Sequence, residues 1–122
     1  MKFCWSTIRV NNLEESLDFY QKIVGLNLNR RFKADENTEI AFLGNDETKL
    51  ELIDSNENNN VNYGEDISLG FEVESLKSKI NQLKKHEISI QSRPIQPNPN
   101  IKFFFVKDPN GLRIQFVENI NN

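Results

Sequence analysis

The sequence predicts an α+β fold built from two βαβββ modules, and an internal repeat is the main observation that predicts it. The order strand, helix, three strands occurs twice within 122 residues. Residues 8–13 (IRVNNL) match residues 71–76 (FEVESL), and residues 49–53 (KLELI) match residues 113–117 (RIQFV). In addition, each predicted helix has one apolar stripe, which must be buried against a face of a sheet. We therefore expect a cupped mixed sheet around a cleft, with the helices on the outer face.

An Asn-rich polar stretch marks the boundary between the modules. Residues 55–65 (SNENNNVNYGE) are aperiodic, which is typical of a linker or a loop. They place the first module at about 1–54 and the second at about 66–122. Because the chain length suits one domain, we expect the modules to form a single domain over residues 1–122.

The first module should begin with a strand over residues 3–10. A helix follows, with Asn12 as its N-cap, Glu15 as the reciprocal partner and Gly25 as the stop. Three strands are expected after it, at about 27–33, 39–43 and 48–54.

The second module should repeat this order, with a strand over residues 66–73 and a helix capped by Ser75. The Pro-rich residues 93–100 are expected to form a loop, because proline is excluded from interior strands. A turn at 108–111 (DPNG) joins the last two strands. The three strands expected after the helix lie at 88–91, at 101–107 and from residue 113 onward.

Composition excludes several classes of partner. The net charge is −3 with both signs dispersed, so nucleic acid is not an expected partner. Cys4 is the single cysteine, so an intrachain disulfide cannot form and a reducing compartment is expected. The chain has no apolar run of membrane-spanning length, so we expect a cytoplasmic protein without a membrane partner.

Strand alternation divides the predicted sheet into two faces. Ile8 and Val10 should point toward the helix, and Trp5, Thr7 and Arg9 should point away from it. The closing strands extend the second face with four polar side chains, which are Lys49, Glu51, Arg113 and Gln115. Such a face is usually solvated, and its charges pair across strands.

Large aromatic side chains argue against plain solvation of this face. Trp5, Phe103 and Phe105 seldom line an open face without a partner. Mixed aromatic, charged and amide groups in a concave site are typical of small-molecule recognition. The second face is therefore the candidate binding surface.

Four motifs together resemble the vicinal oxygen chelate superfamily, which includes glyoxalases, bleomycin-resistance proteins and extradiol dioxygenases. They are a first strand ending in RV, the helix LEESLDFYQKIVGL, the segment KLELID and the hairpin DPNGLRIQFVE. The resemblance spans residues 3–118 and implies paired modules around a cleft, commonly in a homodimer. In metal-dependent members, ligands come from the first and last strands of each module.

Carried over by position, those ligand sites correspond to Trp5, Glu51, Ser68 and Gln115. Glu51 alone keeps a usual ligand type, since indole nitrogen is a donor only and an amide carries no charge. One carboxylate and one amide fall short of the three or four ligands of zinc, nickel or iron sites. The resemblance therefore implies a degenerate site, and we expect neither metal nor another cofactor.

The remaining reactive side chains are poor candidates for chemistry. His86, the single histidine, follows the second helix and is expected at the surface. Cys4 is expected on the helix side, which disfavours a nucleophilic role. Glu51 is the only candidate base, although Arg9, Lys49 and Arg113 on the same face favour its ionised form.

The leading hypothesis is a metal-independent protein that binds a small organic molecule, similar to bleomycin-resistance proteins that sequester a drug. Two alternatives stay open: a glyoxalase-like lyase or isomerase with an altered metal site, and a non-catalytic interaction domain whose cleft is filled by its own side chains. The expected ligand contacts are Trp5, Thr7, Arg9, Lys49, Glu51, Ser68, Phe103, Phe105, Arg113 and Gln115.

Overall fold

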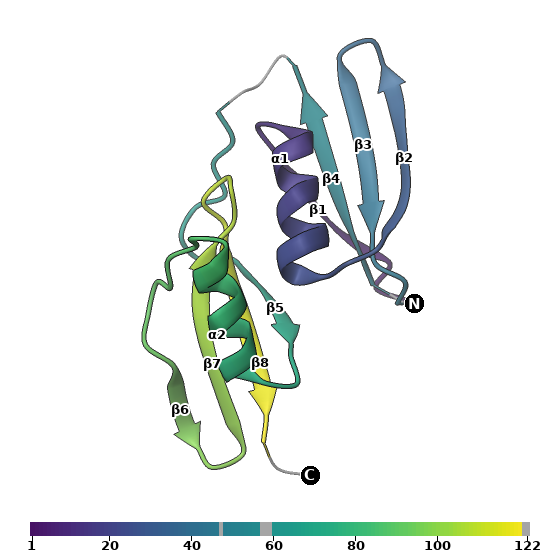
Figure 1. Cartoon of the computed structure of the whole chain (residues 1–122). Coiled ribbons are helices and arrows are strands. Elements are labelled where there is room, and N and C mark those ends of the chain that lie inside the picture. Colours follow the sequence, from purple (N-terminus) through teal and green to yellow (C-terminus); the bar gives the residue numbers. More distant parts are fainter. Residues whose placement is uncertain (47, 57–59, 121–122) are drawn as a thin grey trace. The chain divides into compact units, whose positions relative to one another are not determined.

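The computed structural model describes residues 1–46, 48–56 and 60–120. The chain forms two compact units, Met1–Asn62 and Tyr63–Asn122, and each is described by itself. Both have the α+β architecture that the repeat predicts, with one mixed four-stranded sheet and one helical segment each (Figure 1). Residues 57–59 of the predicted linker lie outside the described part of the chain. The described residues contain no helix long and apolar enough to cross a membrane.

Unit 1 contains a mixed sheet in the order β1-β4-β3-β2. Strands β1 and β4 run parallel, and the other neighbouring pairs are antiparallel. Its elements are β1 (Trp5–Arg9), α1 (Leu13–Asp18), η1 (Phe19–Val24), β2 (Leu28–Asp35), β3 (Thr38–Leu43) and β4 (Lys49–Ser55). The predicted single helix is thus a short α-helix continued by a π-helical turn, and it ends at Gly25, whose positive φ of 91° suits glycine.

Unit 2 repeats this topology with the order β5-β8-β7-β6, in which β5 and β8 are parallel. Its elements are β5 (Ser68–Glu72), α2 (Leu76–Lys85), β6 (Ile95–Asn98), β7 (Ile101–Lys107) and β8 (Arg113–Asn119). The predicted turn at 108–111 is present. The buried Asp108 carboxylate accepts hydrogen bonds from the backbone N–H groups of Asn110 at 2.8 Å and Leu112 at 2.9 Å.

The prediction of a strand at residues 88–91 is wrong. Those residues are irregular. The strand that pairs with the outer side of β7 is β6, which lies inside the segment expected to be a loop. Strand β6 lies at the edge of the sheet, where Pro97 can be accommodated because one side of an edge strand makes no ladder hydrogen bonds. Its pairing with β7 is also irregular between Ile95 and Asn98.

Sheet registers confirm the repeat. Trp5 pairs with Lys49 in unit 1, and the matching residues Ser68 and Arg113 pair in unit 2. The faces follow as predicted, because the apolar residues of alternate positions are buried on the helix side. That buried set in the first and last strands is Ile8, Leu50, Leu52, Ile114 and Phe116.

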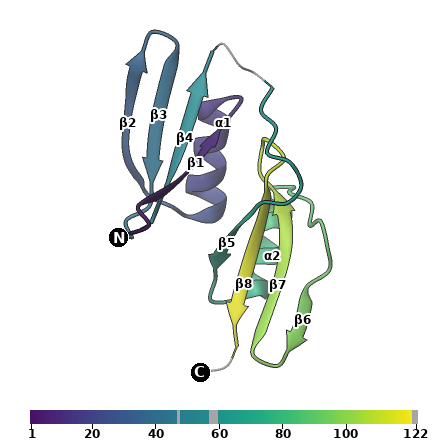
Figure 2. The same ribbon diagram turned by 180° about the vertical axis from the view of Figure 1, so that it is seen from behind.

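Each helix begins at a side-chain cap and at a carboxylate from the closing strand. In unit 1 the Asn12 side chain accepts from the Glu15 N–H at 3.0 Å, and the Asp54 carboxylate accepts from the Leu13 N–H at 2.9 Å. These bonds satisfy donors that a helix N-terminus leaves unpaired, and the anion complements the helix dipole. The bond from Leu13 also joins the helix to β4. Figure 2 shows α1 lying beside this strand.

Unit 2 uses the same arrangement. Ser75 accepts from the Ser78 N–H at 3.1 Å, and Glu118 on β8 accepts from the Leu76 N–H at 2.7 Å. Glu118 occupies the repeat position of Asp54, one residue past the matched segment. The duplication therefore preserved a long-range contact between strand and helix, and not only the local caps.

We expect Asp54→Ala to lower the free energy of unfolding by about 1–3 kcal/mol, because it removes a charged acceptor from a helix N-terminus. Chemical denaturation by urea measures this change. The control is Glu36→Ala, which removes an exposed carboxylate in the β2–β3 turn. Equal destabilisation by both variants would contradict the assigned role of Asp54.

Candidate functional site

The five predicted contact residues of unit 1 share the sheet face opposite the helix. Trp5, Thr7 and Arg9 are exposed and alternate along β1 with the half-buried Ser6 and the buried Ile8. Lys49 and Glu51 on β4 pair with Trp5 and Thr7 in the sheet register. Because paired residues of neighbouring strands lie on one face, the five side chains form one continuous surface, which we call open face 1.

A hydrogen bond organises the centre of open face 1. The Thr7 hydroxyl donates to Oε1 of Glu51 at 2.5 Å. This bond uses one oxygen of the carboxylate and leaves the second oxygen available for another donor. Glu51 is thereby held in place as a charged acceptor.

Aromatic rings occupy the same face beside this pair. Phe42 on β3 pairs with Glu51 in register. The Trp5 ring meets Phe42 in an edge-to-face contact with centroids 5.2 Å apart. Phe32 on β2 stacks against Phe42 at 6.5 Å, and the Arg30 guanidinium lies 4.9 Å from the Phe42 centroid. Such contacts give the rings fixed orientations on an otherwise accessible surface.

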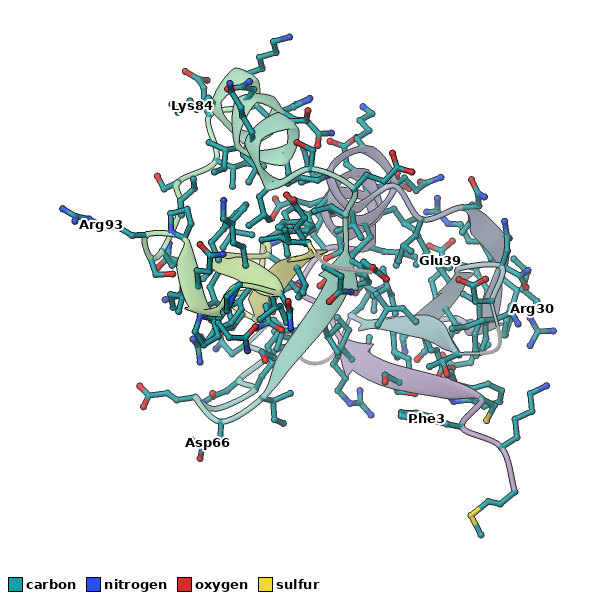
Figure 3. The ribbon with its side chains drawn as sticks, turned by 90° about the horizontal axis from the view of Figure 1, so that it is seen from below. Phe3, Arg30, Glu39, Asp66, Lys84 and Arg93 are labelled. Atoms are coloured by element: carbon teal, nitrogen blue, oxygen red, sulfur yellow. The ribbon has the colours of Figure 1, made fainter. Side chains whose placement is uncertain are left out.

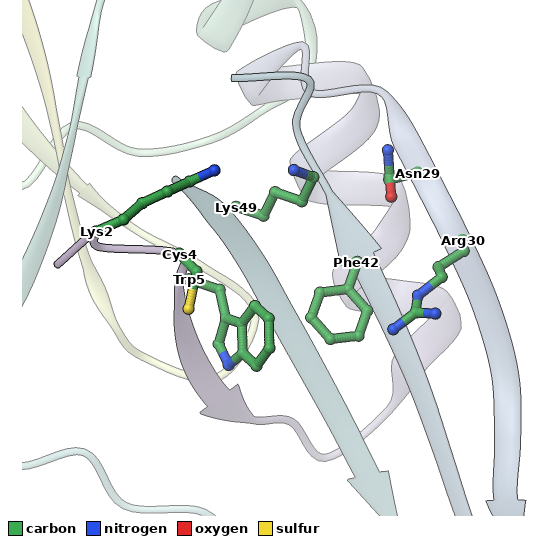
Figure 4. Close-up of a pocket in the computed structure, with 7 residues that line it drawn as sticks. All are labelled: Lys2, Cys4, Trp5, Asn29, Arg30, Phe42 and Lys49. Carbon is green, nitrogen blue, oxygen red and sulfur yellow. The ribbon is translucent and has the colours of Figure 1, made fainter. Parts of the chain in front are cut away.

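The rings of Trp5 and Phe42 border an open pocket of about 210 Å³ at one end of open face 1 (Figure 4). Its lining contains two predicted contacts, Trp5 and Lys49, together with residues that sequence reasoning missed. The additional lining residues are Lys2, Cys4, Asn29, Arg30 and Phe42. The prediction that Cys4 lies on the helix side is wrong. Cys4 is exposed and borders the pocket, because β1 begins at Trp5 and strand alternation does not extend to Cys4.

Two consecutive arginines on β2 have opposite environments. Arg31 donates to Oε2 of Glu39 at 2.6 Å and forms an ion pair with Glu14 of α1. The hydrogen bond to Glu39, then that to Glu14, raises the pKa of Arg31 above its usual range. Arg30 instead contacts the rings of Phe32 and Phe42 on the open face, and Figure 4 shows it beside Phe42. Because side chains alternate along β2, Arg31 points toward the helix side of the sheet and Arg30 toward the pocket.

The five predicted contacts of unit 2 also share one face, which we call open face 2. Ser68 on β5 pairs with Arg113 on β8, and Phe105 on β7 pairs with Gln115. The Arg113 guanidinium lies 4.1 Å from the Phe105 centroid. Phe103 meets Phe105 edge to face at 5.9 Å. Open face 2 therefore combines a cation, aromatic rings and an amide without a carboxylate at its centre.

Gly70 explains how Gln115 lies on open face 2. Gly70 pairs with Gln115 in register, as Thr7 does with Glu51 in unit 1. A Cβ atom added to Gly70 would stand 3.1 Å from Oε1 of Gln115, which is closer than ordinary contact. The absent side chain leaves space for the amide, whereas the matching position in unit 1 holds a hydroxyl donor.

Two titratable side chains with shifted pKa values lie outside these faces. Lys79 on α2 stands 4.9 Å from the Phe116 centroid and donates to Oε1 of Gln82 at 2.6 Å, and burial lowers its pKa. Burial, with a smaller contribution from Asp108, raises the pKa of Tyr63 above its usual range. Lys79 and Phe116 belong to the helix-covered side, so Lys79 serves packing. His86 is exposed at the end of α2, as expected.

The donor set does not fit a metal ion of the kind found in metal-dependent relatives. Of the four positions that the resemblance assigns to ligands, Trp5, Glu51, Ser68 and Gln115, Glu51 alone carries an anionic ligand group. Among the described residues, no group of three or more histidine, cysteine or acidic side chains could hold a metal.

Comparison with protein families decides the membership of the chain. The family model described as Glyoxalase/Bleomycin resistance protein/Dioxygenase superfamily matches residues 3–116. The chain belongs to this superfamily. Residues 3–116 cover nearly all of both modules, so the membership rests on the repeat and not on one motif.

Curated relatives resemble this chain over more than nine-tenths of their length. A lactoylglutathione lyase of Neisseria meningitidis is 29% identical over 126 residues, covering 97% of this chain and 91% of the relative. A lactoylglutathione lyase of Haemophilus influenzae is 27% identical over 132 residues, covering 98% and 93%.

Solved superfamily structures share the fold. The trypanothione-dependent glyoxalase I of Leishmania major gives a TM-score of 0.84 at 24% identity, covering 97% of this chain and 86% of that one. A glyoxalase family protein of Bacillus cereus gives 0.85 at 18% identity, covering 99% and 95%. These likenesses confirm the predicted architecture of a superfamily member.

The single tryptophan of the chain makes the electrostatics of the pocket measurable. Trp5 is 46% exposed, and Lys2, Arg30 and Lys49 line the same pocket. We expect the ratio of iodide to caesium quenching at Trp5 to exceed the ratio for free N-acetyltryptophanamide by about twofold or more at low ionic strength, because local cations concentrate the anion. The net charge of −3 would lower this ratio, so a ratio at or below that of the free indole would contradict a cationic pocket.

Proposed function

We propose that this superfamily member binds a small organic molecule on its open faces without a metal ion. The proposal is supported by the identity of the side chains at the four positions that the resemblance assigns to metal ligands. Trp5 and Gln115 replace ligands that would bring a lone pair or a charge, and Ser68 brings only a neutral hydroxyl. Reaction steps that depend on a bound cation are therefore not assigned to this chain.

The groups that remain suit recognition of an organic ligand. Trp5 supplies a stacking surface, and Glu51 and Gln115 supply hydrogen-bond acceptors on the two open faces. Arg9 and Arg113 are proposed to contact an anionic group of the ligand. Side chains of mixed aromatic, charged and amide type support binding specificity in small-molecule sites. The other proposed contacts are Thr7, Lys49, Ser68, Phe103 and Phe105.

A second candidate function is a glyoxalase-like lyase or isomerase with a metal site completed differently. It is favoured by the curated relatives, which are named lactoylglutathione lyase and align with 97% of this chain. Glu51 is the only candidate base in that case, and Thr7 donates to it. A hemithioacetal isomerisation assay with added metal discriminates the candidates: activity abolished by Glu51→Gln would favour the lyase.

The homodimer that the resemblance implies is part of the same proposal. Native mass spectrometry of the purified protein measures the oligomeric state and detects a co-purified organic molecule. An interaction domain without a ligand predicts no bound mass and no thermal shift across a broad small-molecule panel. Either positive observation would favour the binding function over that third candidate.

We expect calorimetric titration with nickel, zinc and manganese to show no stoichiometric binding, because one carboxylate supplies too few ligand atoms. Glu51→Ala is the matched variant, since it removes that carboxylate. Tight binding of one metal per chain that disappears in Glu51→Ala would overturn the metal-independent proposal.

Restoring the ligand types should restore a metal response. The triple variant Trp5→His, Ser68→His and Gln115→Glu keeps Glu51 and gains two imidazoles and one carboxylate. We expect it to bind nickel or zinc at least about a hundredfold more tightly than the unmodified protein, because all four positions that the resemblance assigns to ligands then carry usual ligand types. Unchanged metal affinity in a folded triple variant would count against the assignment of these positions.

A further inference from the structure

We propose that the pocket on open face 1 accepts a small planar aromatic anion, such as an arene carboxylate. This inference rests on the proposed function and names the class of ligand. It concerns the pocket lined by Lys2, Cys4, Trp5, Asn29, Arg30, Phe42 and Lys49 (Figure 4). All of these residues belong to unit 1, so the inference needs no contribution from unit 2.

The charges of the lining favour an anion. Lys2, Arg30 and Lys49 contribute three positive groups, and the lining contains no carboxylate. The Lys49 ammonium lies 3.4 Å from the Asp46 carbonyl oxygen, a long contact that leaves its other donors available. Arg30 contacts rings and forms no ion pair with the described residues. A carboxylate in the pocket would receive charge-assisted hydrogen bonds from these donors.

The acidic side chain at the centre of open face 1 is not part of the pocket lining. Glu51 accepts from the Thr7 hydroxyl at 2.5 Å and does not line the pocket. The cations are therefore not neutralised by a carboxylate within the lining itself. Neighbouring Arg31 shows the contrast, because it binds Glu39 and Glu14 on the other side of the sheet.

The rings favour a flat body for the ligand. The rings of Trp5 and Phe42 meet at an interplanar angle of 72°. Phe42 is buried, with 5% of its surface exposed, so its ring is held in place by packing. Trp5 keeps 46% exposure, so its ring offers unused contact area. Aromatic faces and edges bind other rings by stacked or edge-to-face contacts, which a flat ligand can make and a bulky aliphatic ligand cannot.

The volume sets the size of the ligand. The pocket measures about 210 Å³. Sites for drug-sized ligands are about 300–1,000 Å³. A single substituted ring suits this volume better than a large antibiotic does.

Two unique residues report directly on this pocket. Trp5 is the single tryptophan and Cys4 the single cysteine, and both are in the lining. Titration with 4-nitrobenzoate is therefore followed by quenching of Trp5 and by protection of Cys4 from iodoacetamide, measured by mass spectrometry. The neutral probe 4-nitrobenzamide removes the charge, and cyclohexanecarboxylate keeps the charge but removes the flat ring. Calorimetry measures the affinity of all three probes for the full-length protein.

We expect 4-nitrobenzoate to bind about tenfold more tightly than 4-nitrobenzamide, which corresponds to one charge-assisted contact. It should also bind several-fold more tightly than cyclohexanecarboxylate. Arg30→Gln should weaken 4-nitrobenzoate about tenfold and leave 4-nitrobenzamide unchanged. The matched control is Lys84→Gln, which removes the same charge from the exposed end of α2 (Figure 3). Lys49→Gln provides a second test if Arg30→Gln fails to fold.

Several results would overturn the inference. These are equal affinity for 4-nitrobenzoate and 4-nitrobenzamide, equal weakening by Arg30→Gln and Lys84→Gln, or calorimetric heat without a change at Trp5 and Cys4. No binding of any of the three probes also overturns it. A different measurement tests the proposed function. That function fails only if the broad thermal-shift panel and native mass spectrometry both reveal no ligand.

Discussion

The contact between a closing-strand carboxylate and a helix N-terminus determines which face of each sheet is available for function. Asp54 receives the Leu13 N–H, and Glu118 receives the Leu76 N–H. Each bond holds its helix against its own closing strand, so the apolar stripe of the helix and the apolar residues of the sheet are buried together. In the described part of each unit, the opposite face of the sheet consequently carries no helix.

The two open faces have diverged although their backbones still match. Unit 1 presents a hydroxyl and a carboxylate, Thr7 and Glu51, in register. Unit 2 presents Gly70 and Gln115 at the corresponding pair, with an amide that carries no charge. The negative charge of the duplicated site therefore lies on one module only. Cationic and aromatic groups surround both positions, which suits recognition of an organic ligand better than binding of a divalent cation.

Local patterns predict much of the fold and part of the site. The repeat, the Asn12 and Ser75 caps and the strand faces were readable, because periodicity and capping are short-range signals. The strand at 88–91 was wrong because pairing with β7, not local propensity, selects β6. Arg30 was missed because β2 has a register shift between Leu28 and Arg30, so its faces cannot be counted from the sequence.

Gly70 has a consequence for how this protein can evolve. A carboxylate at residue 115 would face a residue without a hydroxyl, whereas Glu51 has Thr7 as its donor. Any larger residue at 70 would place its Cβ atom 3.1 Å from the present amide oxygen, so the Gln115 side chain would have to shift by a few tenths of an ångström. The two positions are therefore coupled. Gln115→Glu alone would give both modules a carboxylate, but only a second change, Gly70→Thr, would supply the hydroxyl donor that Thr7 provides in unit 1.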